Sequence, residues 1–467
     1  MTVRARKLSG VAALLAAWAI ATGHVAAEPR FEIHGSNTVG ATLMPALLTA
    51  FAHSRNHEIV RVPGENSEEE TIYVVSGDGP VFTVDLERYG SGTSAKGLLS
   101  GLASIGMSSR PIKDKEAAPL ADRFGLDMRD PASEHVVALD GIAIVVSPSN
   151  PLTQISQEQI ARVFAGDIRD WSELGLAPGP IAVHARDDVS GTYDTFNSLA
   201  LKPFGVKLRS DAARYASNEK LAKTVAADPL SIGFTPLAFA DLAKAVPIAL
   251  SCGMVIGPDK FSVKAEEYPL GRRLFLYTRG EPKDPIPKAL IAFALSDDAQ
   301  AAVDSVGFVD QSIQLQGADA YLNHLDGAMA GVTNRAEIDE LRRYLSITRG
   351  ARRLSTTLRF SHGGARLDGK AVIDAGRLAR WLQLPENAGR TVKLMGFADS
   401  VGGYQANLSL SRQRAEAALR ALRAQLPDGF DESRVSVDAF STLAPVACND
   451  TAVGRSANRR VEVWVSR

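Results

Sequence analysis

The stretch Gly396-Phe397-Ala398-Asp399-Ser400-Val401-Gly402 decides how the C-terminal part of this 467-residue chain folds. It is followed by Leu410-Ser411-Arg412-Gln413-Arg414-Ala415, and the chain ends near Asn458-Arg459-Arg460-Val461-Glu462-Val463. Asp399 comes directly after a strand-like run, and Arg414 lies in an Ala- and Leu-rich helical pattern. A carboxylate binds an ammonium group, and an arginine fork binds a carboxylate through two parallel hydrogen bonds. A pair of this kind in one pocket suits a zwitterionic ligand.

The residues around these segments predict a compact α+β unit. Short apolar runs predict strands and longer periodic runs predict helices, in this order: strand 356–360, helix 371–384, strand 391–397, helix 408–426, strand 435–440 and strand 461–465. One sheet against two helices buries the apolar side of each element. We therefore predict a βαβαββ sandwich over residues 351–467, with Asn407 or Ser409 capping the helix that carries Arg414.

Through these three motifs, residues 350–467 resemble the OmpA-like peptidoglycan-binding domain. In that family the Asp after the strand and the Arg of the Leu-Ser-x-x-Arg-Ala motif hold the side-chain end of diaminopimelate in the peptide stem. The resemblance implies these roles for Asp399 and Arg414, with Asn407 and Arg459 in support. The usual Thr before the Asp is Ala398 here, which removes a hydroxyl but keeps the charge pair. The implied partner is peptidoglycan.

Residues 28–312 alternate between short apolar runs and helical patterns. Strands are predicted at 31–33, 136–147 and 181–184, and a helix over 39–53. This mixture, with Gly- and Ser-rich turns, predicts an open α/β sheet rather than a β-sandwich. Such sheets bind ligands at the loops that join strand ends to helix starts.

Residues 313–350 differ in character from the segments on either side. They contain a charged helical segment at 336–345, and a basic connector follows at 348–353. We predict a linker with one helix between the two domains.

Four loops of the N-terminal unit are rich in glycine and hydroxyl groups. They are Gly35-Ser36-Asn37-Thr38, Gly90-Ser91-Gly92-Thr93-Ser94, Met107-Ser108-Ser109-Arg110 and Arg186-Asp187-Asp188-Val189-Ser190-Gly191-Thr192. Three of them precede helical patterns, whose unpaired N–H groups can hold an anion. Helix capping alone explains one such loop, but several in one domain, with an arginine four residues before Ser-Gly-Thr, predict an oxyanion site.

With these loops, residues 30–312 resemble the PstS-like phosphate-binding proteins of ABC transporters, which have the two-lobed type 2 periplasmic binding fold. The Arg-x-x-x-Ser-Gly-Thr motif is the specific part of the resemblance. It implies that hydroxyls, N–H groups and one guanidinium hold the oxyanion, at Ser36, Thr38, Ser91, Ser109, Arg186, Ser190, Gly191 and Thr192. It also implies that Asp188 orients Arg186 through an ion pair, and that an ABC transporter is a candidate partner.

Ser109 departs from the family pattern. The family has an Asp at this position, eighteen residues after the loop Ser, and that Asp accepts the proton of monohydrogen phosphate. A buried acceptor facing a fully ionised anion is costly, because neither group supplies a proton. A serine can donate or accept. We expect weaker discrimination between phosphate and sulfate.

The first residues predict export. Three basic residues within the first seven positions precede an apolar run at 11–21, and small residues at 25–27 offer a cleavage site. This is the pattern of a signal peptide, over residues 1–27. No apolar stretch reaches the ~18 residues of a spanning helix. We expect the protein in the periplasm, associated with peptidoglycan, with the outer membrane as a further candidate site.

The two cysteines, Cys252 and Cys448, lie in different predicted domains and lack metal-ligand spacing. Export permits a disulfide, yet one bond would have to bridge two domains. Two separate, mostly buried thiols are the favoured interpretation, and pairing stays open.

Several functions are disfavoured by the sequence. Lys and Arg total 52 against 53 Asp and Glu, so charge gives no reason to expect nucleic acid as a partner. No metal-ligand cluster stands out, and no nucleophile has a neighbouring base, so we expect neither a metal, a cofactor nor an enzyme. The leading interpretation is a binding protein for phosphate or a similar oxyanion, anchored non-covalently to peptidoglycan. The alternative is a structural envelope protein whose N-terminal domain has lost small-ligand binding and contacts another protein.

Overall fold

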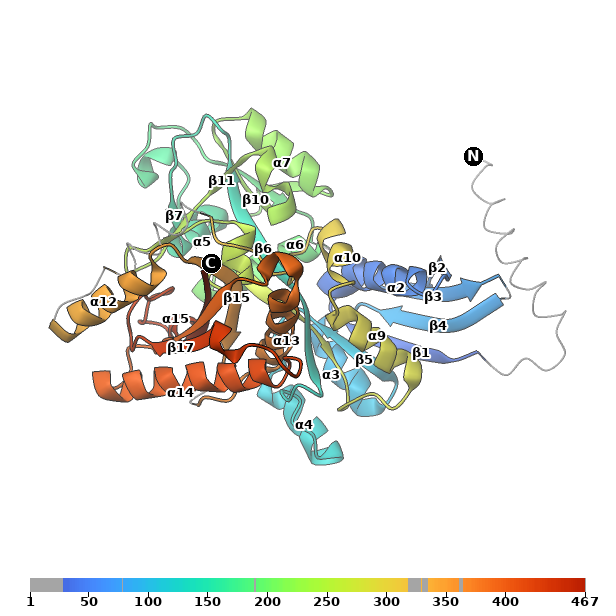
Figure 1. Cartoon of the computed structure of the whole chain (residues 1–467). Coiled ribbons are helices and arrows are strands. Elements are labelled where there is room, and N and C mark those ends of the chain that lie inside the picture. The colour runs from blue at the N-terminus through green and yellow to red at the C-terminus, as the bar shows by residue number, and fades with distance from the viewer. Residues whose placement is uncertain are drawn as a thin grey trace.

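The computed structural model describes residues 28–77, 79–188, 190–317, 329, 335–360 and 364–466. The predicted signal peptide lies outside these residues. Strand β6, Glu134–Val146, is shared by two lobes of the N-terminal domain (Figure 1). Its first half pairs with β14, Gly271–Tyr277, and its second half with β10, Ser231–Pro236, and β11, Lys244–Val246. It is buried along nearly its whole length, which is why its sequence is an almost unbroken apolar run.

The first lobe is built on the strand order β2-β3-β4-β1-β5-β14-β6. The new strands are β1 (Arg30–Gly35), β2 (Glu58–Pro63), β3 (Glu69–Ser76), β4 (Gly79–Glu87) and β5 (Ala103–Ser108). Its helices are α2 (Met44–His53), α3 (Ser91–Ser100), α4 (Asp114–Phe124), α9 (Pro285–Leu295) and α10 (Gln300–Ser305). Helices α2, α9 and α10 share one core with the sheet, which contains Leu47, Leu290 and Val303.

The second lobe continues the sheet from β6 through β10 to β8 (Ala182–Arg186) and β9 (Ala213–Tyr215). A small sheet beside it joins β7 (Ile155–Ser156), β12 (Ile248–Ala249) and β13 (Val255–Ile256). The helices of this part are α5 (Gln157–Ala165), α6 (Gly191–Phe196), α7 (Asn218–Ala227) and α8 (Lys260–Lys264). Phe196 and Phe234 stack at 3.9 Å in its core, and Phe164 packs at 4.6 Å from Phe196. The predicted two-lobed α/β fold is confirmed.

The C-terminal domain is one sheet with helices on it, in the order β15-β18-β16-β17. The strands are β15 (Arg352–Arg359), β16 (Thr391–Gly396), β17 (Val435–Ala439) and β18 (Arg460–Ser466), and the helices are α13 (Gly369–Gln383), α14 (Tyr404–Arg423) and α15 (Ala452–Asn458). The predicted order of strands and long helices is confirmed, and α15 is an addition that the sequence pattern did not indicate. Helix α14 begins at Tyr404, so Asn407 lies inside its first turn and does not cap it.

The described parts of the predicted linker pack on the C-terminal domain. Helix α12, Arg335–Thr348, inserts Tyr344 against Phe440 and Trp464, at centroid distances of 5.3 and 6.1 Å. Leu315 pairs with Leu354 of β15. Residues 318–328 and 330–334 lie outside the described residues.

A disulfide joins the two domains. Cys252, in the loop between β12 and β13, is bonded to Cys448, 196 residues later. The favoured interpretation of two separate thiols is therefore wrong. Ser251 adds a 2.6 Å hydrogen bond to Asp450 beside the disulfide. The second lobe is thus held covalently to the C-terminal domain.

Charged side chains fasten the C-terminal domain to the first lobe as well. Arg377 of α13 donates to the Leu295 carbonyl at 2.9 Å, where α9 ends, and Arg380 donates to Asp297 at 2.8 Å. Figure 1 shows α13 between the C-terminal sheet and the N-terminal domain. One domain therefore contacts both lobes.

Glu266 is the centre of this interface. Burial opposes its ionisation, but Arg273, Lys370 and Arg359 outweigh that effect and hold the pKa of Glu266 at about 2. Arg273 also pairs with Asp368 at 2.7 Å, the residue that caps α13. Glu266 has φ of 58°, a left-handed conformation that costs free energy for a side chain with a Cβ. The attraction between the Glu266 carboxylate and the surrounding cations offsets the cost of this backbone conformation.

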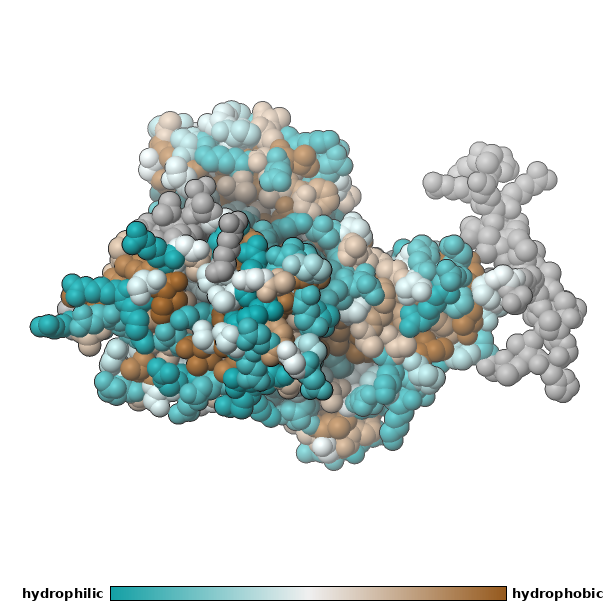
Figure 2. All heavy atoms as spheres, viewed as in Figure 1, coloured by the Kyte–Doolittle hydropathy of each residue, from teal (hydrophilic) through white to brown (hydrophobic). Residues whose placement is uncertain are grey.

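The helices and the exposed apolar side chains bear on whether the protein has features of a membrane protein or a docking site. None of the helices within the described ranges is both long and apolar enough to span a membrane. On the face in Figure 2, hydrophobic and hydrophilic residues are interspersed, and the large exposed apolar side chains of the described residues, such as Leu102 and Val453, are far apart in the sequence. Single exposed apolar residues are ordinary and indicate no docking surface.

Candidate functional site

Thr38 and Gly191, which come from two separate predicted loops, meet between the lobes. Thr38 follows β1 in the first lobe, and Gly191 begins α6 in the second. Thr38 Oγ1 lies 3.5 Å from the Gly191 carbonyl oxygen, and a Cβ added at Gly191 would lie 3.0 Å from Thr38 Cα. The lobes are therefore in contact at the predicted anion loops, and only glycine allows this approach without a shift.

Ser36 anchors the loop that carries Thr38. Its N–H donates to the Met107 carbonyl at 3.0 Å, and its Oγ accepts a long 3.5 Å bond from the Val39 N–H. Gly35 makes this loop possible: its φ is +146°, and an added Cβ would lie 2.0 Å from the Met107 oxygen. Ser36 is 1% exposed, and the contacts that the structure gives it are to the backbone.

Ser91 and Ser109 form a second pair of hydroxyls in the first lobe. Ser91 is the first residue of α3, and Ser109 directly follows β5. Their Oγ atoms are 3.2 Å apart, and the Ser109 N–H donates to Ser91 Oγ at 3.1 Å. Each hydroxyl rotates freely enough to donate or accept. The structure brings together two residues that the sequence separates by eighteen positions.

Arg186 and the Ser190–Thr192 segment lie at the two ends of one tight loop. Strand β8 ends at Arg186, and the Ser190 N–H closes the loop on the Asp187 carbonyl at 3.2 Å. Ser190 caps α6 by accepting from the Tyr193 N–H at 3.4 Å. Thr192 is half-buried on that helix.

The Arg186 guanidinium is held by neutral groups. It donates to the Tyr215 and Ala216 carbonyls at 3.0 Å each, and to the Asn218 side chain. Asp187 approaches it only to 4.0 Å. Burial lowers the pKa of Arg186, and Asp187 partly opposes this. The cation is therefore mostly buried and little compensated.

The predicted ion pair of Asp188 with Arg186 is wrong. Asp188 instead pairs with Arg214 on β9. The pair was implied by the family resemblance, but β8 ends at Arg186 and the chain turns there. The turn directs Asp188 to the neighbouring strand.

A second buried arginine, Arg272 on β14, reaches the same loops and was not predicted. It pairs with Asp140 of β6 at 3.3 Å, donates to Thr38 Oγ1 at 3.1 Å, and contacts the hydroxyl of Thr195 on α6. The available sequence signal was a charged residue beside an apolar strand, in Leu270-Gly271-Arg272. That signal does not identify Asp140 as the partner of Arg272. The pairing follows from the register of β14 with β6, which places the two residues opposite each other.

In the C-terminal domain, Asp399, Arg459 and Asn407 come together as predicted. Arg459 Nη1 donates to Asp399 Oδ2 at 2.7 Å, and Asn407 Nδ2 donates to the Asp399 carbonyl at 3.2 Å. Asp399 follows β16, and Arg459 lies at the end of α15, which brings the last motif back to the first. The Asp399 carboxylate thus already has one cationic partner.

Arg414 lies deeper, with 1% of its surface exposed. Its hydrogen bonds go to the carbonyls of Phe397 at 3.3 Å and Gly364 at 3.2 Å. The pKa of Arg414 is lowered to about 10, mainly by burial and in part by the nearby Arg459, while Asp399 opposes both effects. The guanidinium has neutral acceptors and a like-charged neighbour, so a bound carboxylate would stabilise it.

One group within the described residues has the geometry for a metal ion: Glu32, His34 and Glu87. His34 Nε2 lies 2.7 Å from Glu32 Oε2 and 3.5 Å from Glu87 Oε2. His34 is held by its hydrogen bond to Glu32, so the group has a structural role without a metal ion.

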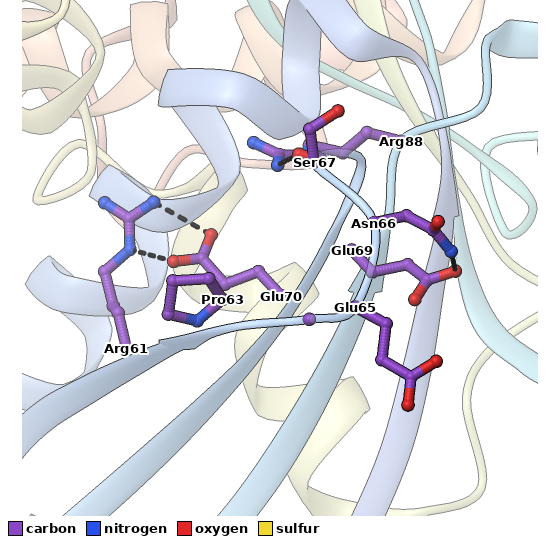
Figure 3. A pocket seen from close by; sticks show the side chains of 9 residues that line it. Arg61, Pro63, Glu65, Asn66, Ser67, Glu69, Glu70 and Arg88 are labelled. Carbon is purple, nitrogen blue, oxygen red and sulfur yellow. Dashed lines mark hydrogen bonds and ion pairs between the residues drawn. The ribbon is translucent and has the colours of Figure 1, made fainter. Parts of the chain in front are cut away.

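A pocket of about 200 Å³ lies at the turn between β2 and β3 (Figure 3). Glu70 beside it is paired with Arg61 through bonds of 2.6 and 2.8 Å, and Asn66 donates to Glu69 at 3.0 Å. Within the acidic run at 65–70, Glu70 is buried and paired. None of the predicted anion-site residues lines this pocket.

Comparison with known proteins agrees with this architecture. Residues 69–298 match the PBP superfamily domain, and residues 359–459 match the OmpA family. These matches define the class: a binding protein of the two-lobed type fused to an OmpA family domain. A phosphate-binding protein PstS from Bacillus subtilis is 30% identical over 226 residues, which cover 48% of this chain and 70% of the relative. The chain belongs to the PstS family through its N-terminal domain.

Other proteins are similar to parts of this chain. A PstS from Borreliella burgdorferi is 25% identical over 278 residues, 57% of this chain and 95% of the relative. A phosphate transport receptor from Vibrio cholerae has a TM-score of 0.46 at 22% identity, with 60% of this chain and 99% of that chain covered. A peptidoglycan-associated lipoprotein from Burkholderia pseudomallei has a TM-score of 0.21 at 22% identity, with coverage of 24% and 89%. The two domains together indicate a periplasmic protein that associates with peptidoglycan.

Proposed function

We propose that the N-terminal domain binds phosphate or a similar oxyanion between its lobes, and that the C-terminal domain anchors the protein to peptidoglycan. The PstS relatives are named as phosphate-binding proteins. The proposed anion residues are Ser36, Thr38, Ser91, Ser109, Arg186, Ser190, Gly191 and Thr192. The mechanism is closure of two lobes around the ligand, without covalent chemistry.

The meeting of Thr38 and Gly191 across the lobes is the observation that carries this proposal. It places donors from the first lobe beside the loop that begins at Arg186. The Arg186 guanidinium is largely buried, and its ion-pair partner within the described residues is Asp187, at 4.0 Å. An oxyanion that accepts from Arg186 would compensate its charge and would be held by hydroxyl donors from both lobes.

Calorimetric titration of the full-length protein with inorganic phosphate tests the proposal. The Arg186→Ala variant should bind phosphate about 10- to 100-fold more weakly, because hydrogen bonds to charged groups contribute about 1.5–3 kcal/mol. Arg209→Ala is the matched control, since Arg209 pairs with Asp211 on the same lobe and lies outside the proposed site. If the wild-type protein binds neither phosphate nor sulfate, the alternative of a structural envelope protein is favoured.

Ser109 bears on the choice of anion. The hydroxyls of Ser91 and Ser109 can both donate, so this side of the site does not require a protonated ligand. We propose weak discrimination between phosphate and sulfate. Titration with both anions checks this, and a large preference for phosphate contradicts it.

For the C-terminal domain, we propose that Asp399 and Arg414 bind the ammonium and carboxylate of diaminopimelate, supported by Asn407 and Arg459. The nearly full burial of Arg414 without a carboxylate hydrogen-bond partner among the described residues supports this role. Co-sedimentation with purified peptidoglycan is the assay. Arg414→Ala should abolish binding, whereas Arg412→Ala, an exposed residue on the same helix, should not.

The remaining parts of the proposal concern the cellular context. We propose that residues 1–27 are a signal peptide, which N-terminal sequencing of the mature protein checks. An ABC transporter is a proposed partner, and the outer membrane a proposed site of association. Co-purification of the tagged protein with membrane fractions tests both.

A further inference from the structure

Arg272 occupies a position between the lobes that the proposed function does not use. It lies on β14 directly opposite Asp140 of β6, and both side chains are more than nine-tenths buried. Its Nε donates to Asp140 Oδ2 at 3.3 Å. A buried arginine keeps its charge only when a carboxylate or several acceptors compensate it. Asp140 supplies that compensation and fixes the guanidinium on the strand pair.

The other end of the guanidinium reaches both lobes. Nη2 donates to Thr38 Oγ1 at 3.1 Å in the first lobe, and to the hydroxyl of Thr195 in the second. Thr195 in turn bonds to Asp140 Oδ2 at 3.0 Å and to the Gly191 carbonyl at 2.8 Å. One side chain therefore links the loop of Thr38 with the helix that begins at Gly191.

The bond from Arg272 determines what the Thr38 hydroxyl can do. A hydroxyl that accepts from a cation keeps its own proton available to donate. The Thr38 hydroxyl can donate this proton to the Gly191 carbonyl oxygen, but the two oxygen atoms are 3.5 Å apart, at the outer limit of a hydrogen bond. The Thr195 hydroxyl, by contrast, has two close acceptors. Among the residues that the structure describes, Thr38 is thus a donor without a close acceptor.

We propose that Arg272 is a positioning residue for anion binding, which holds the Thr38 hydroxyl as a donor to the oxyanion. This inference rests on the proposed function of the N-terminal domain. Arg272 acts through Thr38 and does not touch the anion. Its removal should weaken binding only as far as Thr38 contributes.

A double-mutant cycle on the full-length protein tests this, with inorganic phosphate as the probe in calorimetry. The variants are Thr38→Val, the charge-balanced pair Asp140→Asn with Arg272→Gln, and the combination of all three. The balanced pair leaves no uncompensated buried charge, and Gln is too short to reach Thr38. Thr38→Val and the balanced pair should each weaken phosphate binding by about tenfold or more. The combination should be within about twofold of Thr38→Val alone, because residues that act through one contact are not additive.

A second cycle is the matched control. Arg186→Lys with the balanced pair should show additive losses, since Arg186 and Arg272 have separate partners. Arg272→Lys should recover part of the binding, because its ammonium can still donate to Thr38. Circular dichroism and the melting temperature show that each variant is folded. Additive losses in the first cycle, or unchanged affinity of the balanced pair, overturn the positioning role. A wild-type protein that does not bind phosphate overturns the proposed function instead, and the inference with it.

Discussion

The disulfide between Cys252 and Cys448 makes a strong prediction about stability. Replacing both cysteines by serine removes a link between residues 196 positions apart. In the chain-entropy model, a loop of this length destabilises the unfolded state by about 5 kcal/mol, which is an upper limit when the native structure adjusts. The chain beyond the predicted signal peptide has roughly 440 residues, so its entropy of unfolding is about 0.9 kcal/mol/K. If both domains unfold together, the melting temperature should fall by about 6 °C.

Differential scanning calorimetry under oxidising conditions is the assay. Reductant should lower the melting temperature of the wild-type protein to that of the double-serine variant and leave the variant unchanged. Titration of thiols in the unfolded, non-reduced protein should detect none. Two free thiols, or melting temperatures that agree within about 1 °C, would refute the reasoning. If the C-terminal domain unfolds first, a separate transition should appear in the variant at a lower temperature.

Three further predictions concern the sites and the packing of α12. Ser109→Asp should raise the ratio of phosphate to sulfate affinity, because a buried carboxylate accepts a proton from monohydrogen phosphate and repels sulfate; paired calorimetric titrations measure this, and an unchanged ratio contradicts it. Asp399→Asn should weaken binding to peptidoglycan in co-sedimentation, since the amide no longer neutralises an ammonium; equal binding of the variant and wild type would exclude that contact. The pKa of Glu340 on α12 is raised to about 7, mainly by burial and in part by Glu337 and Asp438, whereas Arg343 and Tyr404 lower it. The folded protein therefore keeps this proton at a pH where the unfolded chain has released it, and stability falls as pH rises from about 4.5 to about 7. Glu340→Gln should flatten this decline in melting curves at pH 5 and 8, and an identical slope in both proteins would disprove it.

Much of the C-terminal domain could be predicted because short sequence motifs define its strands and helices without reference to distant residues. Asp399 follows an apolar strand and Arg414 lies on a periodic helix, so each motif places its own residue. Helix α15 was not predicted because its seven residues include a glycine and lack apolar residues at helical spacing. Gly454 of that helix packs so closely on the Cys448 carbonyl that a Cβ would lie 1.9 Å away, which is a tertiary requirement.

In the N-terminal site, residues in loops that follow strands could be predicted from the sequence. Contacts between strands that are far apart in the sequence could not. Ser91 and Ser109 were named from their loops, and they lie 3.2 Å apart. Arg272 and Asp140 are separated by more than 130 residues and become partners only through the register of β14 with β6. The pairing of the cysteines has the same cause, because sequence separation says nothing about which surfaces two domains share.

The charge cluster around Glu266 limits how the C-terminal domain can be exchanged for another domain. Two of its cations, Arg359 and Lys370, belong to the C-terminal domain, and Arg273 to the N-terminal one. Consider a grafted OmpA family domain that lacks these two side chains. It would leave a strained, negatively charged residue facing an apolar or mismatched surface. A substitution on one side of this interface therefore constrains which residues the other side can accept.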